Sequence, residues 1–287
     1  MPLTAADVGK TIEPRVQHID ARWIMAYAAC LRDFLPCYLD THDRTVIAHP
    51  VFPVAVEWDP IVRQSRQPDF LSALRPEERL RGVHGSHDLH IHRPIRAGDI
   101  LSTNVKQIGV FASRAGAIQA AKLESRDAYG ERVCTTYMQS LYRRVALEGP
   151  EESNEFSPPL PDFRFSEVVD LAFQIQVPEG QAHVYTECSR IYSPIHTDRA
   201  VAIAAGLPDL ILHGTCTLAL AVSTLVRHLL DGEPVRVVRV GCRFSAMVRM
   251  PSVLTIRVIR RASDRAAFEV INPDGDRAIK DGFLCWR

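Results

Sequence analysis

The segment from Tyr185 to Asp198 combines residue types and spacings that are suited to chemistry. Ser193 followed by Pro194 predicts the start of a helix, because Ser can accept a hydrogen bond from a free backbone N–H and Pro at the first helical position sacrifices none. His196 then lies in the first turn. The positive end of the helix dipole disfavours an imidazolium there, so we expect a neutral ring that can accept a proton near pH 7. A core histidine that hydrogen-bonds to the backbone fits the same spacing.

The pair His213 and Gly214 opens a second, longer helix, expected from about Thr215 to Leu230 and stopped by Gly232. A Gly at a helix N-terminus lets a ligand approach free backbone N–H groups, which suits an oxygen that gains negative charge during a reaction. Ordinary helix capping is the alternative explanation.

The segment from about Pro194 to Ala205 is expected to form the helix that carries His196. It is apolar on every side, and Gly206 and Pro208 follow it, as is typical of a helix end. We therefore expect a buried central helix with His196 at its edge.

The length of 287 residues allows two domains of about 140 residues each. A linker is expected from Glu148 to Phe165, where Pro, Gly and Glu cluster without an apolar period. We place one domain at 1–150 and the other at 160–287.

Two pairs of similar segments indicate a duplication: 100–105 resembles 253–258, and 127–132 resembles 272–277. The second pair is expected to form hairpin turns, each with a Gly available for positive φ. In the first half, a helix from about Asp20 to Leu39 precedes the strands. In the second half, the two helices above precede them. The predicted fold is α+β, with a curved antiparallel sheet wrapped around a helix and then repeated.

Charge and composition restrict the partners and the location. Lys plus Arg equals Asp plus Glu, at 34 each, so no net field attracts nucleic acid or an anionic membrane. The segment Met1 to Lys10 lacks the pattern of a signal peptide, and Arg227 and His228 interrupt the longest apolar stretch, so no membrane span is expected. The seven cysteines show no CxxC spacing, which predicts free thiols in a cytoplasmic protein, without disulfides or a metal site.

Taken together, these segments resemble the hydratase-2 signature of the MaoC-like family, the (R)-specific enoyl-CoA hydratases and dehydratases. The matching residues of the second half are Tyr185, Ser189, Pro194, Ile195 and His196, then His213, Gly214, Arg243 and Phe244. Those of the first half are Pro50 to Pro53, His84, Gly85 and Arg93 to Asp99. The resemblance covers nearly the whole chain.

The resemblance implies a pseudo-dimeric double hotdog, in which the second hotdog is catalytic and the first widens the acyl-binding tunnel. It implies the addition of water to an enoyl-CoA thioester, or the reverse dehydration, in fatty acid metabolism and without a cofactor. In the family, an Asp and a His position and deprotonate the water, and the backbone N–H of the Gly in the His-Gly pair stabilises the enolate oxygen. We therefore expect His196 and the N–H of Gly214 to lie within about 6 Å of a common point.

The sequence departs from the family pattern at three positions. Ile191 stands in place of the catalytic Asp, Arg190 in place of the preceding Gly, and Ser193 in place of Asn. A general base contributes about 10²- to 10⁴-fold in rate, so His196 must act alone or with another acid. The candidates for that acid are Asp198, Glu187 and Asp88. Ser193 can still hydrogen-bond a water molecule.

Two other functions stay open. A non-catalytic acyl-CoA-binding protein would keep the tunnel and lose the chemistry. A hotdog thioesterase would need a carboxylate along the central helix, and Asp209 lies beyond its end. For either enzyme or binder, the residues expected to contact the substrate are Tyr192, His213 and Arg243, and those expected to meet the CoA phosphates are Arg199, Arg243 and Arg249. Two copies of the chain could form a homodimer.

Overall fold

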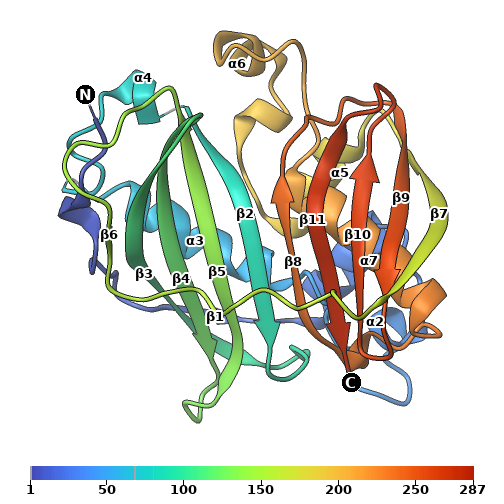
Figure 1. The fold of residues 1–287 in the computed structure, drawn as a ribbon. Coiled ribbons are helices and arrows are strands. Elements are labelled where there is room, and N and C mark those ends of the chain that lie inside the picture. Colours follow the sequence, from blue (N-terminus) through green and yellow to red (C-terminus); the bar gives the residue numbers. More distant parts are fainter. Residues whose placement is uncertain (1, 68, 80) are drawn as a thin grey trace.

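In the computed structural model, which describes residues 2–67, 69–79 and 81–287, the strands form one antiparallel sheet (Figure 1). The strands are β1 (Arg15–His18), β2 (Gly82–Ile91), β3 (Ile100–Ser113), β4 (Gly116–Arg126), β5 (Arg132–Arg143), β6 (Glu152–Ser153), β7 (Glu167–Val177), β8 (Val237–Phe244), β9 (Ser252–Arg261), β10 (Arg265–Ile271) and β11 (Arg277–Trp286). The α-helices are α1 (Ala21–Cys30), α2 (Pro36–Leu39), α3 (Pro53–Ser65), α4 (Pro76–Arg79), α5 (Gln181–Ser189), α6 (Arg199–Ala204) and α7 (Gly214–Leu229). Short 3₁₀ turns are η1 (Ala5–Asp7), η2 (Pro194–His196) and η3 (Pro234–Arg236).

The strand order reads the same from both edges of the sheet. It runs β1-β3-β4-β5-β2 in the first half and continues β8-β11-β10-β9-β7 in the second, with the short β6 beside β3. The halves meet where β2 pairs antiparallel with β8, from Ser86 opposite Arg243 to His90 opposite Arg239. The predicted double hotdog, with its two sheets side by side, is confirmed.

The two hairpin turns expected from the repeated segments have the same internal hydrogen bonds. In the β4–β5 turn, Oδ1 of Asp127 accepts from the backbone N–H groups two and four residues later. In the β10–β11 turn, Oδ1 of Asn272 does the same. Gly130 and Gly275 have φ values of 83° and 82°, a conformation that favours Gly. The duplication therefore extends to the details of the turns.

The prediction that one helix from Asp20 to Leu39 forms the centre of the first half is wrong. It divides into α1, which ends at Cys30, and the single turn α2. The helix that lies behind the strands of the first half is α3 (Figure 1), which the sequence analysis did not predict and which contains Pro53 and Pro60.

Two local features let α3 form around its prolines. Pro53 stands at the helix start, where its missing N–H costs no hydrogen bond. Pro60, inside the helix, cannot donate to the carbonyl of Val56, and the side chain of Gln17 donates to that carbonyl instead, at 2.6 Å. A contact from β1 therefore compensates for the proline.

The segment from Pro194 to Ala205 is also not a buried central helix. It forms the turn η2 and the six-residue helix α6, in which Ile203 is 55% exposed and only Ala202 is buried. The sixteen-residue α7 occupies the place behind the strands of the second half (Figure 1), as its apolar length requires, so no room is left there for the shorter helix. The prediction of a long helix from about Thr215 to Leu230 is confirmed.

The expectation about the thiols can be checked directly. All seven cysteines are free, and Cys37, Cys188 and Cys285 are partly exposed whereas the other four are buried. None of the helices in the described part of the chain is both long and apolar enough to cross a membrane.

One ion pair fastens the junction between the halves. Arg239 of β8 donates two hydrogen bonds to the carboxylate of Asp88 on β2, at 2.7 and 2.8 Å, and a third to the carbonyl of Pro159 in the linker. Leu89, next along β2, packs into the main core, so Asp88 lies on the opposite face of the sheet, which the linker crosses (Figure 1). Asp88 thus has a structural partner at the junction, and its role as a catalytic acid stays a prediction.

Replacing Asp88 by Asn should lower the free energy of unfolding by about 3 kcal/mol, because Arg239 would keep its position without a counter-charge. Burial acts to raise the pKa of Asp88, but hydrogen bonds and charges from Arg239 and His90 outweigh it and hold the pKa below the ordinary 3.8. A lowered carboxyl pKa stabilises the fold above the ordinary value, and this stabilisation is lost as the pH falls below it. Urea denaturation should therefore show a large difference at pH 7 that shrinks toward pH 3. Asp274→Asn, which breaks the exposed pair with Arg249, is the control and should change little; equal effects of both substitutions would contradict the role of Asp88.

Candidate active site

The ring of His196 is held so that one nitrogen stays free. Its Nδ1 lies 2.8 Å from the backbone carbonyl of Ile211, and since a carbonyl can only accept, Nδ1 carries the proton. The other nitrogen, Nε2, then has a lone pair and can accept a proton from a ligand or water. Burial lowers the pKa of His196 below its usual value, and the bond to Ile211 opposes that shift only in part. His196 is therefore a neutral base at pH 7.

A second imidazole holds the first in place. The ring of His213 stacks on that of His196, with 3.7 Å between centroids and 26° between planes. Nε2 of His213 lies 3.2 Å from the hydroxyl of Thr186 on α5. Burial, with the neighbouring His196, lowers the pKa of His213 to about 2, so this ring also stays neutral. His213 acts here as a buried packing partner of His196.

The stacking places His196 beside the N-terminus of α7, which begins at Gly214. The first hydrogen bond from an α7 backbone N–H back to the preceding turn runs from Thr217 to the carbonyl of His213. Among the described residues, no side chain caps this end, and no acceptor binds the N–H groups of Gly214, Thr215 or Cys216. Free donors at the positive end of a sixteen-residue helix favour a negatively charged oxygen.

Gly214 is required at its position by close packing. A Cβ atom there would lie 2.8 Å from Cδ1 of Phe244, at the end of β8. The ring of His84, on β2 of the first half, lies 4.8 Å from that of Phe244. Both halves therefore contribute to the wall around the start of α7. The pairing of β2 with β8 brings His84 here, a contact that no local sequence pattern could reveal.

The position of the missing Asp is apolar in the structure as well. Ile191 is only 5% exposed. Arg190, before it, has a φ of 61°, the left-handed region that favours Gly, which explains why a Gly suits the family pattern there. The guanidinium of Arg190 lies 4.0 Å from the ring centroid of Trp23 and 3.9 Å from Asp20, both of the first half. These contacts offset the strain of an Arg in that conformation.

Four other residues selected from the sequence lie within ten residues of His196 in the chain, and the backbone N–H of His196 donates to the carbonyl of Ser193 at 3.2 Å. Ser193 precedes η2 but makes no capping hydrogen bond, so that expectation is wrong. Asp198 caps α6, accepting from the N–H groups of Ala200 and Val201 at 2.9 and 3.2 Å. Glu187 is exposed, and Tyr192 is 59% exposed. Their roles in catalysis or binding stay predictions, as does the 6 Å separation.

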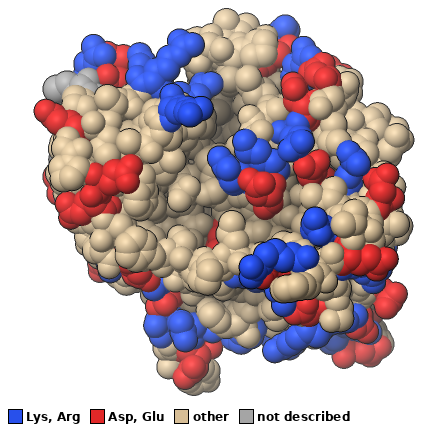
Figure 2. Space-filling model, in the orientation of Figure 1, with Lys and Arg blue, Asp and Glu red and all other residues tan. Residues whose placement is uncertain are grey.

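The cations expected to meet phosphates are each paired with a carboxylate. Arg243 lies 3.3 Å from Asp281, and the pairs Arg199 with Asp209 and Arg249 with Asp274 are 3.2 and 2.9 Å apart. All of these side chains are substantially exposed. Figure 2 shows Lys and Arg beside a hollow between the two halves, on a surface where both charges alternate.

Comparison with known families agrees with this geometry. Residues 163–276 match the model of the MaoC like domain, and residues 6–136 match that of the FAS1-like, dehydratase domain region. Each model covers less than half of the chain, and together the two matches support the resemblance to MaoC-like hydratases and dehydratases predicted from the sequence.

Individual relatives show the same likeness. Enoyl-CoA hydratase ChsH3 of Mycobacterium tuberculosis is 33% identical over 110 residues, 38% of each chain. The 3-hydroxyacyl-thioester dehydratase Y of the same organism is 28% identical over 203 residues, 68% of each chain. A MaoC-like dehydratase from Phytophthora capsici has the same fold, with a TM-score of 0.85 and 19% identity over 98% of this chain and 96% of that one. The chain spans less than two thirds of the length of several curated relatives that it matches, ChsH3 among them.

Replacing Gly214 by Ala should lower any turnover by about 10²- to 10³-fold, because the methyl group would displace Phe244 or turn the helix donors away from a ligand. Steady-state rates and the melting temperature should be measured together. Combining G214A with Phe244→Leu makes room for the methyl group and should restore the melting temperature without restoring the rate. Full recovery of the rate in the double variant would mean that Gly214 serves packing alone.

Proposed function

We propose that this protein adds water to the double bond of an enoyl-CoA thioester, or removes it from a 3-hydroxyacyl-CoA. The observation that carries the proposal is the free Nε2 of His196 next to the uncapped N-terminus of α7. One group accepts a proton from water, and the other stabilises an enolate oxygen. These are the two requirements of the reaction.

In the proposed mechanism, the substrate carbonyl accepts a hydrogen bond from the N–H of Gly214. His196 takes a proton from water as the water oxygen bonds to C3, and the negative charge moves to the thioester oxygen as an enolate. The protonated His196 then returns the proton to C2. The product gains a hydroxyl at C3 and a hydrogen at C2, and His196 is neutral again. No second acid is required by this balance.

The first half is proposed to be the non-catalytic domain, residues 1–150, which widens the acyl tunnel of the catalytic domain, 160–287. The start of α3 supports this division. It lies at the position that α7 takes in the second half, but Pro53 stands there and has no N–H to donate. A small cavity of about 20 Å³ at the junction is lined by both halves, including His49 and Cys134 of the first and Pro234 and Val237 of the second.

We propose the cytoplasm as the location, on the basis of the seven free thiols. The CoA phosphates are proposed to meet exposed arginines such as Arg243, after exchange of its present carboxylate partner Asp281. A homodimer stays a prediction.

A non-catalytic acyl-CoA-binding protein is the second candidate function. The buried Ile191 favours it, because this side chain offers neither charge nor hydrogen bond where the family has its Asp. A spectroscopic assay at the enoyl-thioester absorbance, on short and medium enoyl-CoAs, separates the two functions. Turnover supports the hydratase, whereas tight binding without turnover on every chain length would identify a binding protein.

A carboxylate on a central helix, which a thioesterase would need, does exist in the first half. Glu57 of α3 is buried and accepts a hydrogen bond from Thr136. Burial raises the pKa of Glu57 to about 8, so its carboxyl group is mostly protonated at pH 7 and is a poor general base. Asp209 pairs with Arg199 on the surface. Neither residue supports thioester hydrolysis as well as His196 and Gly214 support hydration.

Replacing His196 by Ala should lower kcat/KM by at least about 10²-fold, because the proton acceptor is lost. In the wild type, protonation of His196 should stop the reaction, and its pKa is lowered from 6.5, so the rate should stay level down to pH values below 6.5 and fall only there. His183→Ala is the control, since that exposed ring lies 3.1 Å from the carbonyl of Thr197 and is not assigned a part in the proton transfer. An unchanged rate in His196→Ala would show that the active site lies elsewhere.

Replacing Ile191 by Asp should raise the hydration rate if the rest of the site is intact, because a carboxylate there can hold the attacking water and stabilise the imidazolium that forms as His196 takes its proton. It also buries a charge, so the melting temperature should fall. The control is Ile191→Asn, because Asn has the shape of Asp without its charge. This variant should leave the rate unchanged. Equal rates in the Asp and Asn variants would exclude this position from the chemistry.

A further inference from the structure

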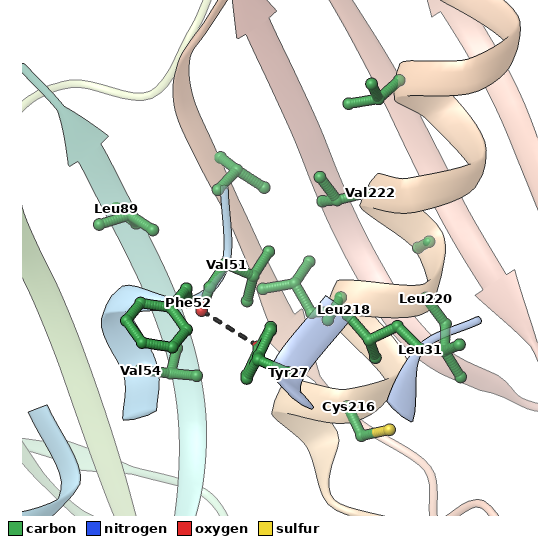
Figure 3. Packing of buried hydrophobic residues seen from close by; sticks show 14 of the residues in the cluster. Tyr27, Leu31, Val51, Phe52, Val54, Leu89, Cys216, Leu218, Leu220 and Val222 are labelled. Atoms are coloured by element: carbon green, nitrogen blue, oxygen red, sulfur yellow. Dashed lines mark hydrogen bonds between the residues drawn. The ribbon is translucent and has the colours of Figure 1, made fainter. Parts of the chain in front are cut away.

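A chain of hydroxyl groups, two of them buried phenols, connects the first half to the start of α7. The hydroxyl oxygen of Tyr27, on α1, lies 3.3 Å from the carbonyl of Val51 (Figure 3) and 3.2 Å from the phenol oxygen of Tyr185, on α5. Because Tyr27 has a single hydroxyl proton, it donates either to Val51 or to Tyr185, and the connection toward α7 forms when it donates to Tyr185. Tyr185 in turn donates to Oγ1 of Thr215 at 3.2 Å. Thr215 is the residue after Gly214, so the chain ends in the turn that holds the free N–H groups.

Both phenols are inaccessible to solvent. Tyr27 and Tyr185 have no exposed surface. Burial, with the neighbouring phenol and thiols, raises the pKa of Tyr27 well above its usual value, and burial does the same for Tyr185. Both groups therefore keep their protons and act through hydrogen bonds alone. A buried hydroxyl that loses its partner is costly, so these bonds hold the hydroxyl groups in position.

The hydroxyl of Tyr27 is separable from the packing of its ring. The ring contacts that of Phe52 edge to face, with 5.3 Å between centroids, and Phe52 contacts Trp23 in the same way at 5.0 Å. Phe at position 27 would keep these ring contacts and lose only the hydrogen bonds. The Tyr27→Phe substitution therefore tests the hydrogen bonds of the hydroxyl without changing the packing of the ring.

Building on the proposed function, we propose that Tyr27 is a positioning residue for the reaction. Through Tyr185 and Thr215 it fixes the first turn of α7, so that the N–H of Gly214 points at the thioester oxygen. Tyr27 does not contact the substrate. The non-catalytic half thus contributes to the rate through a hydrogen-bonded connection to the oxyanion-binding turn.

The first test compares two buried tyrosines. Tyr27→Phe should lower kcat by about 3- to 10-fold, the value of one hydrogen bond, with KM changed less than kcat. Tyr38→Phe is the matched control, because Tyr38 is equally buried and its hydroxyl has no hydrogen-bond partner in the described parts of the chain. It should leave kcat unchanged. Thr215→Val should reproduce the effect of Tyr27→Phe, and Thr215→Ser, which keeps the hydroxyl, should restore kcat.

The second test needs no turnover. Octanoyl-CoA carrying ¹³C at the thioester carbonyl has no double bond to hydrate, and the stretching frequency of its bound carbonyl reports the strength of the hydrogen bond to that oxygen. We expect a lower frequency on the wild type, on Tyr38→Phe and on Thr215→Ser than on Tyr27→Phe and Thr215→Val. Melting temperatures confirm that each variant is folded.

The two proposals fail in different ways. No hydration by the wild type, with the expected pattern of carbonyl frequencies, overturns the proposed function and supports the positioning role. Hydration by the wild type, with kcat and carbonyl frequency the same in Tyr27→Phe and Tyr38→Phe, overturns the positioning role and leaves the function standing. If octanoyl-CoA binds no variant and the wild type hydrates nothing, both proposals are wrong.

Discussion

The antiparallel pairing of β2 with β8 is the contact on which the rest of the structure depends. The two strands pair over five residues and join the two halves into one continuous sheet. Each half would otherwise expose an edge strand that could pair with another chain. The pairing also sets the position of each half relative to the other. His84 reaches Phe244 and Asp88 reaches Arg239 only because these strands are paired in this register.

The candidate site shows how burial can replace charge. His196 and His213 are both neutral because burial lowers both pKa values, and two neutral rings can stack at 3.7 Å where two imidazolium ions would repel each other. Among the described residues, no carboxylate acts on either imidazole to favour its protonation, and Ile191 occupies the position where the family has its Asp. In the proposed reaction, the free energy for stabilising the enolate would then come mainly from the backbone donors at the N-terminus of α7.

The duplicated halves differ where function would require it. The turns and the strand order repeat closely, but one central helix begins with His213 and Gly214 and the other with Phe52 and Pro53. Without an N–H at that point, the first half cannot offer the same donor to an oxyanion. The first half instead supplies Trp23, whose ring faces the guanidinium of Arg190, and Tyr27, whose phenol oxygen lies 3.2 Å from that of Tyr185.

The sequence by itself determined the features that depend on local order: the repeated turns, the long helix from Gly214, the family motif and the missing Asp at Ile191. Those follow from periodicity, from Gly at positive φ and from spacing along one segment. It could not reveal α3, because a side chain from β1, Gln17, satisfies the carbonyl that Pro60 leaves free. The prediction of a core helix from Pro194 to Ala205 was wrong, because apolar character alone does not show which of two helices packs against the sheet. The stacking of His196 on His213, and the connection from Tyr27 to Thr215, join residues far apart in the chain. Only the tertiary structure decided them, since hydrogen bonds and ring contacts depend on distances in space that no spacing along the sequence specifies.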